Sequence, residues 1–89
     1  MAFYAKTVTA TDDNPFSFDQ SPIVLSNCSI RCKTNGCLFG NQANVVADIT
    51  PGGVEFYTTD VRVDELWFMN LTAGLNTTII ITGPVRGSV

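Results

Sequence analysis

Turn-forming residues recur along the whole chain at short spacing, and no other feature limits the possible folds as strongly. No window shows the sustained i, i+3, i+4 pattern of apolar residues that marks an amphipathic helix. Threonine is frequent and the best helix formers are sparse, which favours strands. The turn signals are Asp13-Asn14-Pro15, Ser21-Pro22, Asn35-Gly36, Pro51-Gly52-Gly53, Ala73-Gly74 and Gly83-Pro84. Short strands between such turns predict an all-β fold, a small antiparallel β-sandwich or jelly-roll-like barrel.

The length of 89 residues fits a single domain spanning residues 1–89. Within it, residues 10–21 are expected to form a polar loop or arm. A domain this small buries only about 60–65% of the surface of its unfolded chain, and small domains often gain stability by forming oligomers. The predicted strands lie near residues 3–9, 22–33, 37–40, 43–49, 54–58, 61–63, 66–71 and 77–82.

Asn35-Gly36 is the strongest local signal, because Asn-Gly between two extended runs favours the two-residue turn of a β-hairpin. Pairing outward from this turn sets Thr34 opposite Cys37 and Cys32 opposite Phe39. Alternation along the strands then separates an inward face from an outward face that carries charged residues. The side chains expected in the core, including two from a later strand, are Cys28, Ile30, Cys32, Phe39, Leu66 and Phe68.

The three cysteines Cys28, Cys32 and Cys37 are predicted to be small core hydrophobes. An odd number of cysteines without a signal peptide argues against a disulfide framework. A structural zinc site normally needs four Cys or His ligands, and the chain has no His. A Cys32–Cys37 bridge or an intermolecular disulfide remains the alternative.

The composition argues against several classes of partner. The net charge is −3 with only 5 basic residues, so nucleic acid is not expected as a partner. The longest apolar run is Leu66-Trp67-Phe68-Met69, which is far too short for a transmembrane helix, so no membrane is expected as a partner. The first residues lack the apolar core of a signal peptide, so we expect the protein to be made in the cytoplasm and not secreted by that route.

Catalytic constellations are also missing from the sequence. Without His, neither a Ser-His-Asp nor a Cys-His arrangement can form within this chain. Asp12 and Asp13 lack the spaced oxygen ligands of a calcium loop. We therefore predict a protein that is not an enzyme, with no catalytic residues, no metal site and no cofactor. The remaining acids, interpreted as ordinary surface charges, are Asp48, Glu55, Asp60, Asp64 and Glu65.

The strand around Leu66–Met69 breaks the inside–outside alternation, because it is apolar on both faces. After a bend or bulge at Asp64-Glu65, we expect Leu66 and Phe68 to face the core, with Trp67 and Met69 pointing the other way. One alternative is a strand buried on both sides within the fold, or a bulge that reorients the chain. The other is a contact with another subunit.

The second alternative predicts an apolar patch on an isolated monomer. The strand of residues 77–82 would place Ile80, or the Ile79 and Ile81 pair, beside the outward side chains of 66–69. Exposed apolar patches usually mark interaction sites. The residues predicted for contact with a second copy or with another protein are Trp67, Met69, Ile80 and Tyr57.

The order of motifs from Cys28 onward resembles that of small virion proteins of tailed bacteriophages. These proteins share an alternating strand, an Asn-x-Gly-like turn, an aromatic-Gly strand, a Pro-Gly-Gly-like turn and a Val-Asp-x-Leu-Tyr strand. The resemblance covers about 55 of the 89 residues. The matching segments are Ser29-Ile30-Arg31-Cys32-Lys33, Thr34-Asn35-Gly36, Cys37-Leu38-Phe39-Gly40-Asn41, Pro51-Gly52-Gly53, Val54-Glu55-Phe56-Tyr57, Val63-Asp64-Glu65-Leu66-Trp67-Phe68 and the final Thr-Ile-Ile-Ile strand.

This resemblance implies a small β-sandwich that decorates or cements a phage capsid, or that sits in a head fibre or tail. It implies a homo-oligomer, with a trimer favoured, located in the virion and bound to other virion proteins such as the major capsid protein. The chain departs from the family pattern in its cysteines and in its N-terminal 20 residues, which leaves the docking partner open.

A carbohydrate- or receptor-binding module of a phage tail or fibre is the alternative function. Trp67, Tyr57 and Tyr4 are the aromatic residues that could stack on a sugar. Such sites combine aromatic rings with exposed acids and amides, whereas aromatic residues within strands usually belong to a core or an interface. The position of Trp67 therefore separates the two functions: burial between chains favours assembly, and an open shallow groove favours a sugar.

Overall fold

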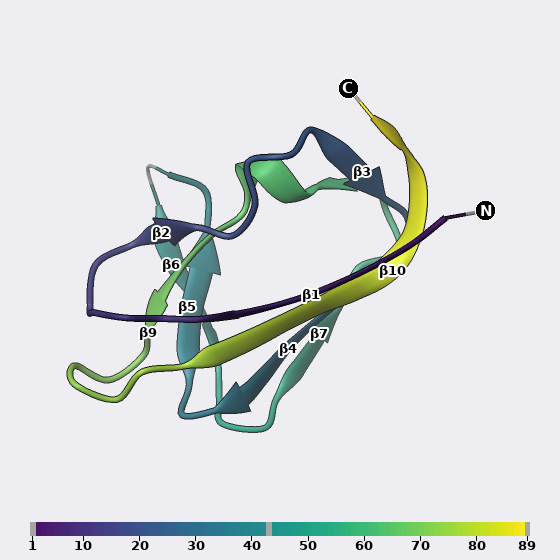
Figure 1. Cartoon of the computed structure of the whole chain (residues 1–89). Coiled ribbons are helices and arrows are strands. Elements are labelled where there is room, and N and C mark those ends of the chain that lie inside the picture. Colours follow the sequence, from purple (N-terminus) through teal and green to yellow (C-terminus); the bar gives the residue numbers. More distant parts are fainter. Residues whose placement is uncertain (1, 43, 89) are drawn as a thin grey trace.

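The computed structural model of the protein describes residues 2–42 and 44–88, which form an all-β fold of two antiparallel sheets (Figure 1). The described residues also include a short 3-10 turn, η1 (Val63–Glu65). Across this part of the chain, no helix has both the length and the apolar character needed to cross a membrane. The strands are β1 (Phe3–Thr9), β2 (Phe16–Ser17), β3 (Ile23–Leu25), β4 (Ser29–Thr34), β5 (Cys37–Gly40), β6 (Val45–Ile49), β7 (Val54–Phe56), β8 (Val61–Arg62), β9 (Trp67–Asn70) and β10 (Thr78–Ser88).

The larger sheet, here called the β10 sheet, is organised around its longest strand. Its order is β7-β4-β10-β3-β8, and β1 pairs with the other side of β10. The first part of β10 lies between β1 and β4, whereas its last residues pair with β3. Figure 1 shows β10 running beside β1 and curving toward the C-terminus. The smaller sheet, here called the β9 sheet, has the order β2-β9-β5-β6.

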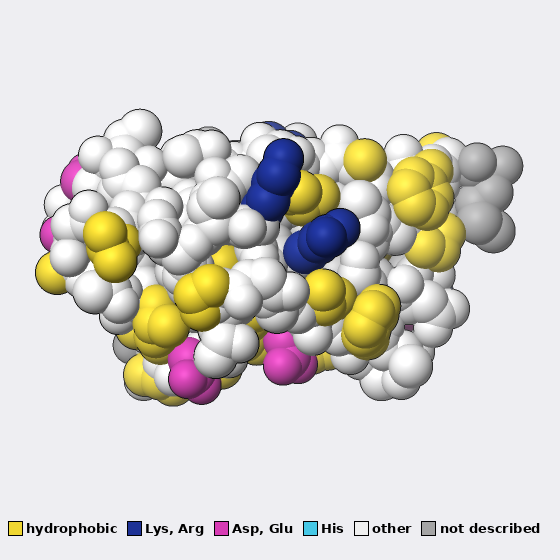
Figure 2. Space-filling model, turned by 90° about the horizontal axis from the view of Figure 1, so that it is seen from below, with side chains coloured by type: hydrophobic (Ala, Val, Ile, Leu, Met, Phe, Trp, Pro, Cys, Tyr) yellow, Lys and Arg dark blue, Asp and Glu magenta, His cyan; other side chains and the backbone are white. Residues whose placement is uncertain are grey.

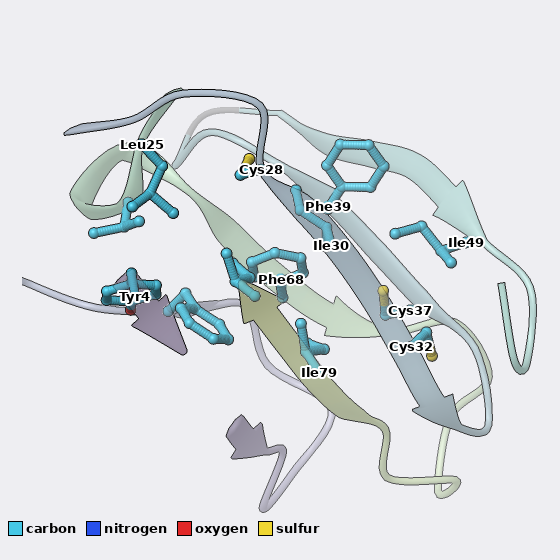
Figure 3. Packing of buried hydrophobic residues seen from close by; sticks show 13 residues of the cluster. Tyr4, Leu25, Cys28, Ile30, Cys32, Cys37, Phe39, Ile49, Phe68 and Ile79 are labelled. Atoms are coloured by element: carbon cyan, nitrogen blue, oxygen red, sulfur yellow. The ribbon is translucent and has the colours of Figure 1, made fainter. Parts of the chain in front are cut away.

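The core fills the space between the two sheets (Figure 3). Phe68 is fully buried, and its ring centroid lies 5.5 Å from that of Phe18 and 6.2 Å from that of Phe39. Leu66 is partly buried and packs against this cluster. The structure therefore places every residue of the predicted core in or against it. The other buried members include Cys28, Ile30, Cys32, Cys37, Ile49, Ile79 and Ile81.

The predicted hairpin at Asn35-Gly36 is wrong, although the chain does turn there. β4 pairs with β10 and β7, whereas β5 pairs with β6 and β9, so the turn connects the two sheets. A type I′ hairpin turn needs positive φ at both central residues. Asn35 has a φ of 53°, but the positive-φ glycines of the described chain are Gly52 and Gly74. The inward side chains of β4 and β5 consequently meet across the core. They are buried as predicted, although the two strands do not pair with each other.

The predicted strand 22–33 is also wrong as one element. It consists of β3 and β4, separated by residues 26–28, where Asn27 adopts a φ of 53°. This interruption lies where the neighbour of β10 changes from β4 to β3. β10 in turn runs through the predicted turn at Gly83-Pro84, and the Pro84 carbonyl accepts a hydrogen bond from the Ser26 N–H at 3.1 Å.

Residues 10–21 are not a free arm. Residues 11–15 are exposed, but Ala10 and Phe18 are buried, and β2 within this segment pairs with β9. The Phe18 N–H also donates to the Leu66 carbonyl at 3.0 Å. Phe16 and Phe18 pack into or against the core and hold this segment in place. The sequence prediction overlooked these two residues because most of their neighbours are polar.

The remaining boundaries differ by a few residues. Residue 43 of the predicted strand 43–49 lies outside the described residues, and β6 begins at Val45. The predicted bend at Asp64-Glu65 is present as the 3-10 turn η1 and not as a bulge. Its Asp64 and Glu65 both bond to Arg62, which stabilises a tight turn at this position.

Gly83 marks the closest approach of β10 to the chain between β3 and β4. A Cβ atom at this position would lie 2.9 Å from Cα of Cys28 and 3.0 Å from its Cβ. Because a backbone atom cannot move aside as a flexible side chain can, Gly83→Ala should lower the free energy of unfolding by about 1–3 kcal/mol in urea denaturation. Gly87→Ala is the matched control, since nothing lies within 4 Å of its Cβ position. Equal stability of the two variants would contradict this packing.

Candidate functional site

The outward face of the β9 sheet carries the side chains that the sequence predicted for an interface. Phe68 and Asn70 of β9 point inward and are buried, whereas Trp67 and Met69 alternate with them and are half-buried. Leu38 of β5 lies directly opposite Met69 and is also half-buried. Trp67 lies opposite Gly40, so no neighbouring side chain competes for the space beside the indole on that strand.

The edge strand β6 lies beside β5 in this sheet. Val46 is the extra residue at an irregularity in the β5–β6 pairing, and its side chain is 75% exposed. Asp48, opposite Leu38, is the nearby charge on β6. We call Leu38, Trp67 and Met69 the β9 face. Leu38 was not predicted for this surface, because the partners of β9 depend on pairings that alternation within one strand does not reveal.

Ile80 does not join this surface, contrary to expectation. It lies on β10, in the other sheet, between Thr7 of β1 and Arg31 of β4. Its neighbours Ile79 and Ile81 are fully buried, so Ile80 is the outward member of the triplet. The outer surfaces of two stacked sheets face away from each other, and Ile80 therefore cannot form one patch with Trp67 and Met69.

The outward face of the β10 sheet is a mixed surface instead. Arg31 lies opposite Val54 of the edge strand β7, and Phe56 of the same strand is 75% exposed. Figure 2 views the molecule from below the orientation of Figure 1 and shows basic side chains with hydrophobic ones around them and acidic ones nearby. This surface combines charged side chains with apolar area, whereas the β9 face is nearly uncharged.

A shallow open groove of about 400 Å³ lies at the end of the sandwich where β9 begins. Tyr57, predicted for the interface, lines this groove and packs edge-to-face on Phe39, with ring centroids 6.4 Å apart. Its backbone N–H donates to the Cys28 carbonyl at 2.9 Å, which fixes its position on the core. The groove combines the apolar side chains of Phe39, Tyr57 and Leu66 with the charged side chains of Asp60, Arg62 and Glu65.

The charged side chains of the groove are paired. Arg62 donates to both carboxylate oxygens of Asp64, at 3.0 and 2.6 Å, and its Nε lies 3.3 Å from Glu65. The hydrogen bonds to Asp64 raise the pKa of Arg62, and the same bonds lower the pKa of Asp64. Arg86 forms a further ion pair with Asp60 at 3.1 Å. The three acids Asp60, Asp64 and Glu65 thus face the two bases Arg62 and Arg86, so most of the charge at the groove is balanced by ion pairs and a small negative excess remains.

The opposite end of the sandwich is closed by a buried polar network around Asn70. The side-chain amide of Asn70 donates to Oδ1 of Asp13 at 2.8 Å, to Oδ1 of Asn76 at 2.9 Å and to the Asp12 carbonyl at 3.1 Å. Its Oδ1 accepts the N–H of Thr77 at 2.9 Å. One side chain thus connects the loop after β1 to the loop before β10. In the sequence, Asn70 follows the apolar run Leu66–Met69. The alternation of apolar residues did not predict that its side chain would be buried and hydrogen-bonded.

The cysteines join the core as expected and are free thiols. Sγ of Cys32 lies 3.0 Å from the Thr77 hydroxyl and 3.2 Å from the Asn35 carbonyl, so it contributes to the polar end of the core. Burial, with the neighbouring Cys32, raises the pKa of the Cys37 thiol to about 12. Burial also raises the pKa of Cys28. Thiols with raised pKa values stay protonated at neutral pH and are therefore poor nucleophiles.

No protein-family model matches the chain, and comparisons with curated proteins and with solved structures give no significant match.

Asn70→Asp tests the polar network. The introduced carboxylate cannot donate to Asp13 and would place a second negative charge beside it, so we expect a loss of about 3 kcal/mol in unfolding free energy at pH 7. Burial and the adjacent charge would raise the folded-state pKa of the new carboxyl. Its cost should therefore shrink as the pH falls toward the unfolded value of about 3.9. Asn14→Asp, in the exposed part of the same loop, is the control in urea titrations at pH 7 and pH 4. Equal losses for both variants would contradict the role of Asn70.

The pH dependence of stability follows from three aspartates. The Asn70 side chain and then the Gly74 N–H lower the pKa of Asp13. Burial raises the pKa of Asp19, but hydrogen bonds from the Ser21 N–H and the Tyr4 hydroxyl outweigh it and lower the pKa overall. Together with the lowered pKa of Asp64, these shifts place the folded-state values below the ordinary 3.8.

A group whose pKa is lower in the folded state than in the unfolded state stabilises the fold at pH values above its unfolded-state pKa. This stabilisation is lost as the pH falls through its folded-state pKa. The urea midpoint should therefore drop between pH 5 and pH 2.5. Asp13→Asn should flatten this drop relative to the wild-type protein. A midpoint that stays constant or rises on acidification would disagree with these contacts.

Proposed function

We propose that this chain is a non-enzymatic structural protein that assembles with copies of itself and with other proteins of a particle. The specific role that the sequence resemblance favours is a cement or decoration protein that stabilises the head of a tailed bacteriophage. The observation that carries the assembly proposal is the β9 face, an apolar surface on the outer side of a sheet that this domain does not cover.

The make-up of the β9 face supports a protein partner. Aromatic residues and Met are enriched in the centres of protein interfaces, where charged residues are depleted. Trp67 and Met69 lie together on one strand, beside Leu38, with Asp48 as the neighbouring charge. Half-buried positions also lose less conformational freedom on binding than fully exposed ones, because their rotamers are already restricted.

The composition agrees with an assembled protein. Charged residues make up 15% of the chain, against about a quarter in typical globular proteins. A domain of this size gains stability when it buries further surface against a partner. A homo-oligomer, a trimer by analogy with the phage proteins, bound to the major capsid protein fits both points. Its location would then be the virion.

The non-enzymatic part of the proposal is supported by the chemistry of the residues. The chain has no His, and the acids of the groove form ion pairs with Arg62 and Arg86. The buried thiols have raised pKa values, which disfavours the thiolate form that nucleophilic catalysis needs.

Met69→Asp and Ile80→Asp form a matched pair, because both residues are half-buried and point outward from a central strand of their own sheet. If copies associate through the β9 face, Met69→Asp and Trp67→Ala should weaken self-association at least tenfold, about 1.4 kcal/mol. Ile80→Asp should have a smaller effect. Sedimentation velocity over a concentration series measures this, with circular dichroism as the folding control. A larger effect of Ile80→Asp would move the interface to the β10 sheet, and a wild-type protein that stays monomeric would refute self-association.

The virion role has its own test, which is electron microscopy of particles from the source. We expect the chain on the outer surface of the head, with the β9 face against another subunit. Particles that lack it should lose their DNA at lower temperature or lower salt. Finding the chain outside any particle would overturn the virion role and leave the self-association result unaffected.

A further inference from the structure

We infer that the groove beside Tyr57 binds a neutral saccharide. This groove is formed by different side chains from those of the β9 face, so the inference does not depend on how the protein assembles. Ligand sites typically have volumes of about 300–1,000 Å³, combining apolar walls with a few polar groups. The groove of about 400 Å³ lies within this range.

The apolar part of the groove suits the C–H face of a sugar ring. Tyr57 is half-buried, and its backbone bond to Cys28 and its ring contact with Phe39 hold it in place. Leu66, which packs against the core, also lines the groove. An aromatic face carries partial negative charge that attracts the polarised C–H groups of a pyranose. Because Tyr57 is already positioned, its ordering would cost little on binding.

The polar part of the groove suits hydroxyl groups. Asp60 and Glu65 each have an ion-pair partner, yet a carboxylate has about four acceptor positions, so each can accept further hydrogen bonds. Arg62 uses its Nε and Nη2 groups on acidic neighbours, which leaves Nη1 to donate to a ligand. The groove therefore presents donors and acceptors on one side and hydrocarbon on the other.

The charges also argue against other ligand classes. An anion bound at Arg62 would lie beside the carboxylates of Asp64 and Glu65, which would repel it. A cation bound at the acids would lie beside the guanidinium groups of Arg62 and Arg86. In residues 2–42 and 44–88, no three acidic or cysteine side chains converge as a metal site would require. A neutral polyol with an apolar face is the ligand that uses all of the lining without breaking an ion pair.

The other two aromatic residues considered for a sugar lie elsewhere. Trp67 belongs to the β9 face and is not part of the groove lining. Tyr4 is buried, and its hydroxyl donates to Asp19 at 2.8 Å. Tyr57 is therefore the aromatic residue on which saccharide binding would depend.

Titration of the ¹⁵N-labelled protein with glucose, galactose, mannose and N-acetylglucosamine, followed by NMR, tests this inference. At least one of these sugars should give saturable shifts centred on residues 57–66, with a Kd of about 1–5 mM, as expected for an open site. Glucuronate, which carries a carboxylate, should bind at least fivefold more weakly than glucose. No saturable shift with any neutral sugar up to about 50 mM, or shifts centred on another surface, would overturn the inference.

Variants identify the residues responsible. Tyr57→Ala should weaken binding at least tenfold, and Asp60→Asn, an isosteric change at an exposed residue, about fivefold. Phe56→Ala is the matched control, because it removes an aromatic ring next to Tyr57 in sequence that is 75% exposed and lies outside the groove lining. If Tyr57→Ala fails to fold, Asp60→Asn decides the matter. Undiminished binding by Asp60→Asn, or an equal loss in Phe56→Ala, would refute the assignment.

Discussion

The face-to-face packing of β4 against β5 across the Asn35-Gly36 turn is the interaction on which the rest of the structure depends. Because the two strands lie in different sheets, each has both of its edges available for other partners. β4 pairs with β10 and β7, and β5 pairs with β9 and β6. A hairpin at this turn would have occupied one edge of each strand and left no space between two sheets. The core, the outer faces and the two ends of the sandwich all follow from this separation.

The sequence predicted the fold class and a correct part of the core, because both depend on alternation within single strands. Cys32 and Phe39 are buried as expected, and β5 has the predicted bounds. Alternation says which side chains share a face, but it does not say which strand lies beside which. The hairpin at Asn35-Gly36 failed for this reason, since Asn-Gly favours a tight turn locally while burial between two sheets favours separating the strands.

The same limit explains what could be predicted of the candidate sites. Trp67 and Met69 were placed on an outward face by the pattern of their own strand, whereas Leu38 joins them only through the β5–β9 register. Ile80 was expected beside them on the assumption that the strand 77–82 is a neighbour of 66–69, whereas β10 and β9 lie in different sheets. The groove combines residues from β5, from the chain before β8 and from η1, a combination that no local pattern indicates. Asn70 shows the converse case, in which a polar residue is buried because two loops far apart in the sequence supply its hydrogen-bond partners.

The central position of β10 has a consequence for how the chain folds. β1 pairs with β10 from Phe3 opposite Pro84 to Thr9 opposite Thr78, so strands far apart in the sequence must meet before this sheet can close. Pairings of such high contact order form slowly, because the entropy of closing a long loop is lost before the contacts are gained. Until β10 inserts, β1 and β4 both present unpaired backbone groups that could pair with strands of another chain. The rate at which β10 pairs with β1 and β4 therefore sets how long the folding chain can misassemble with other chains.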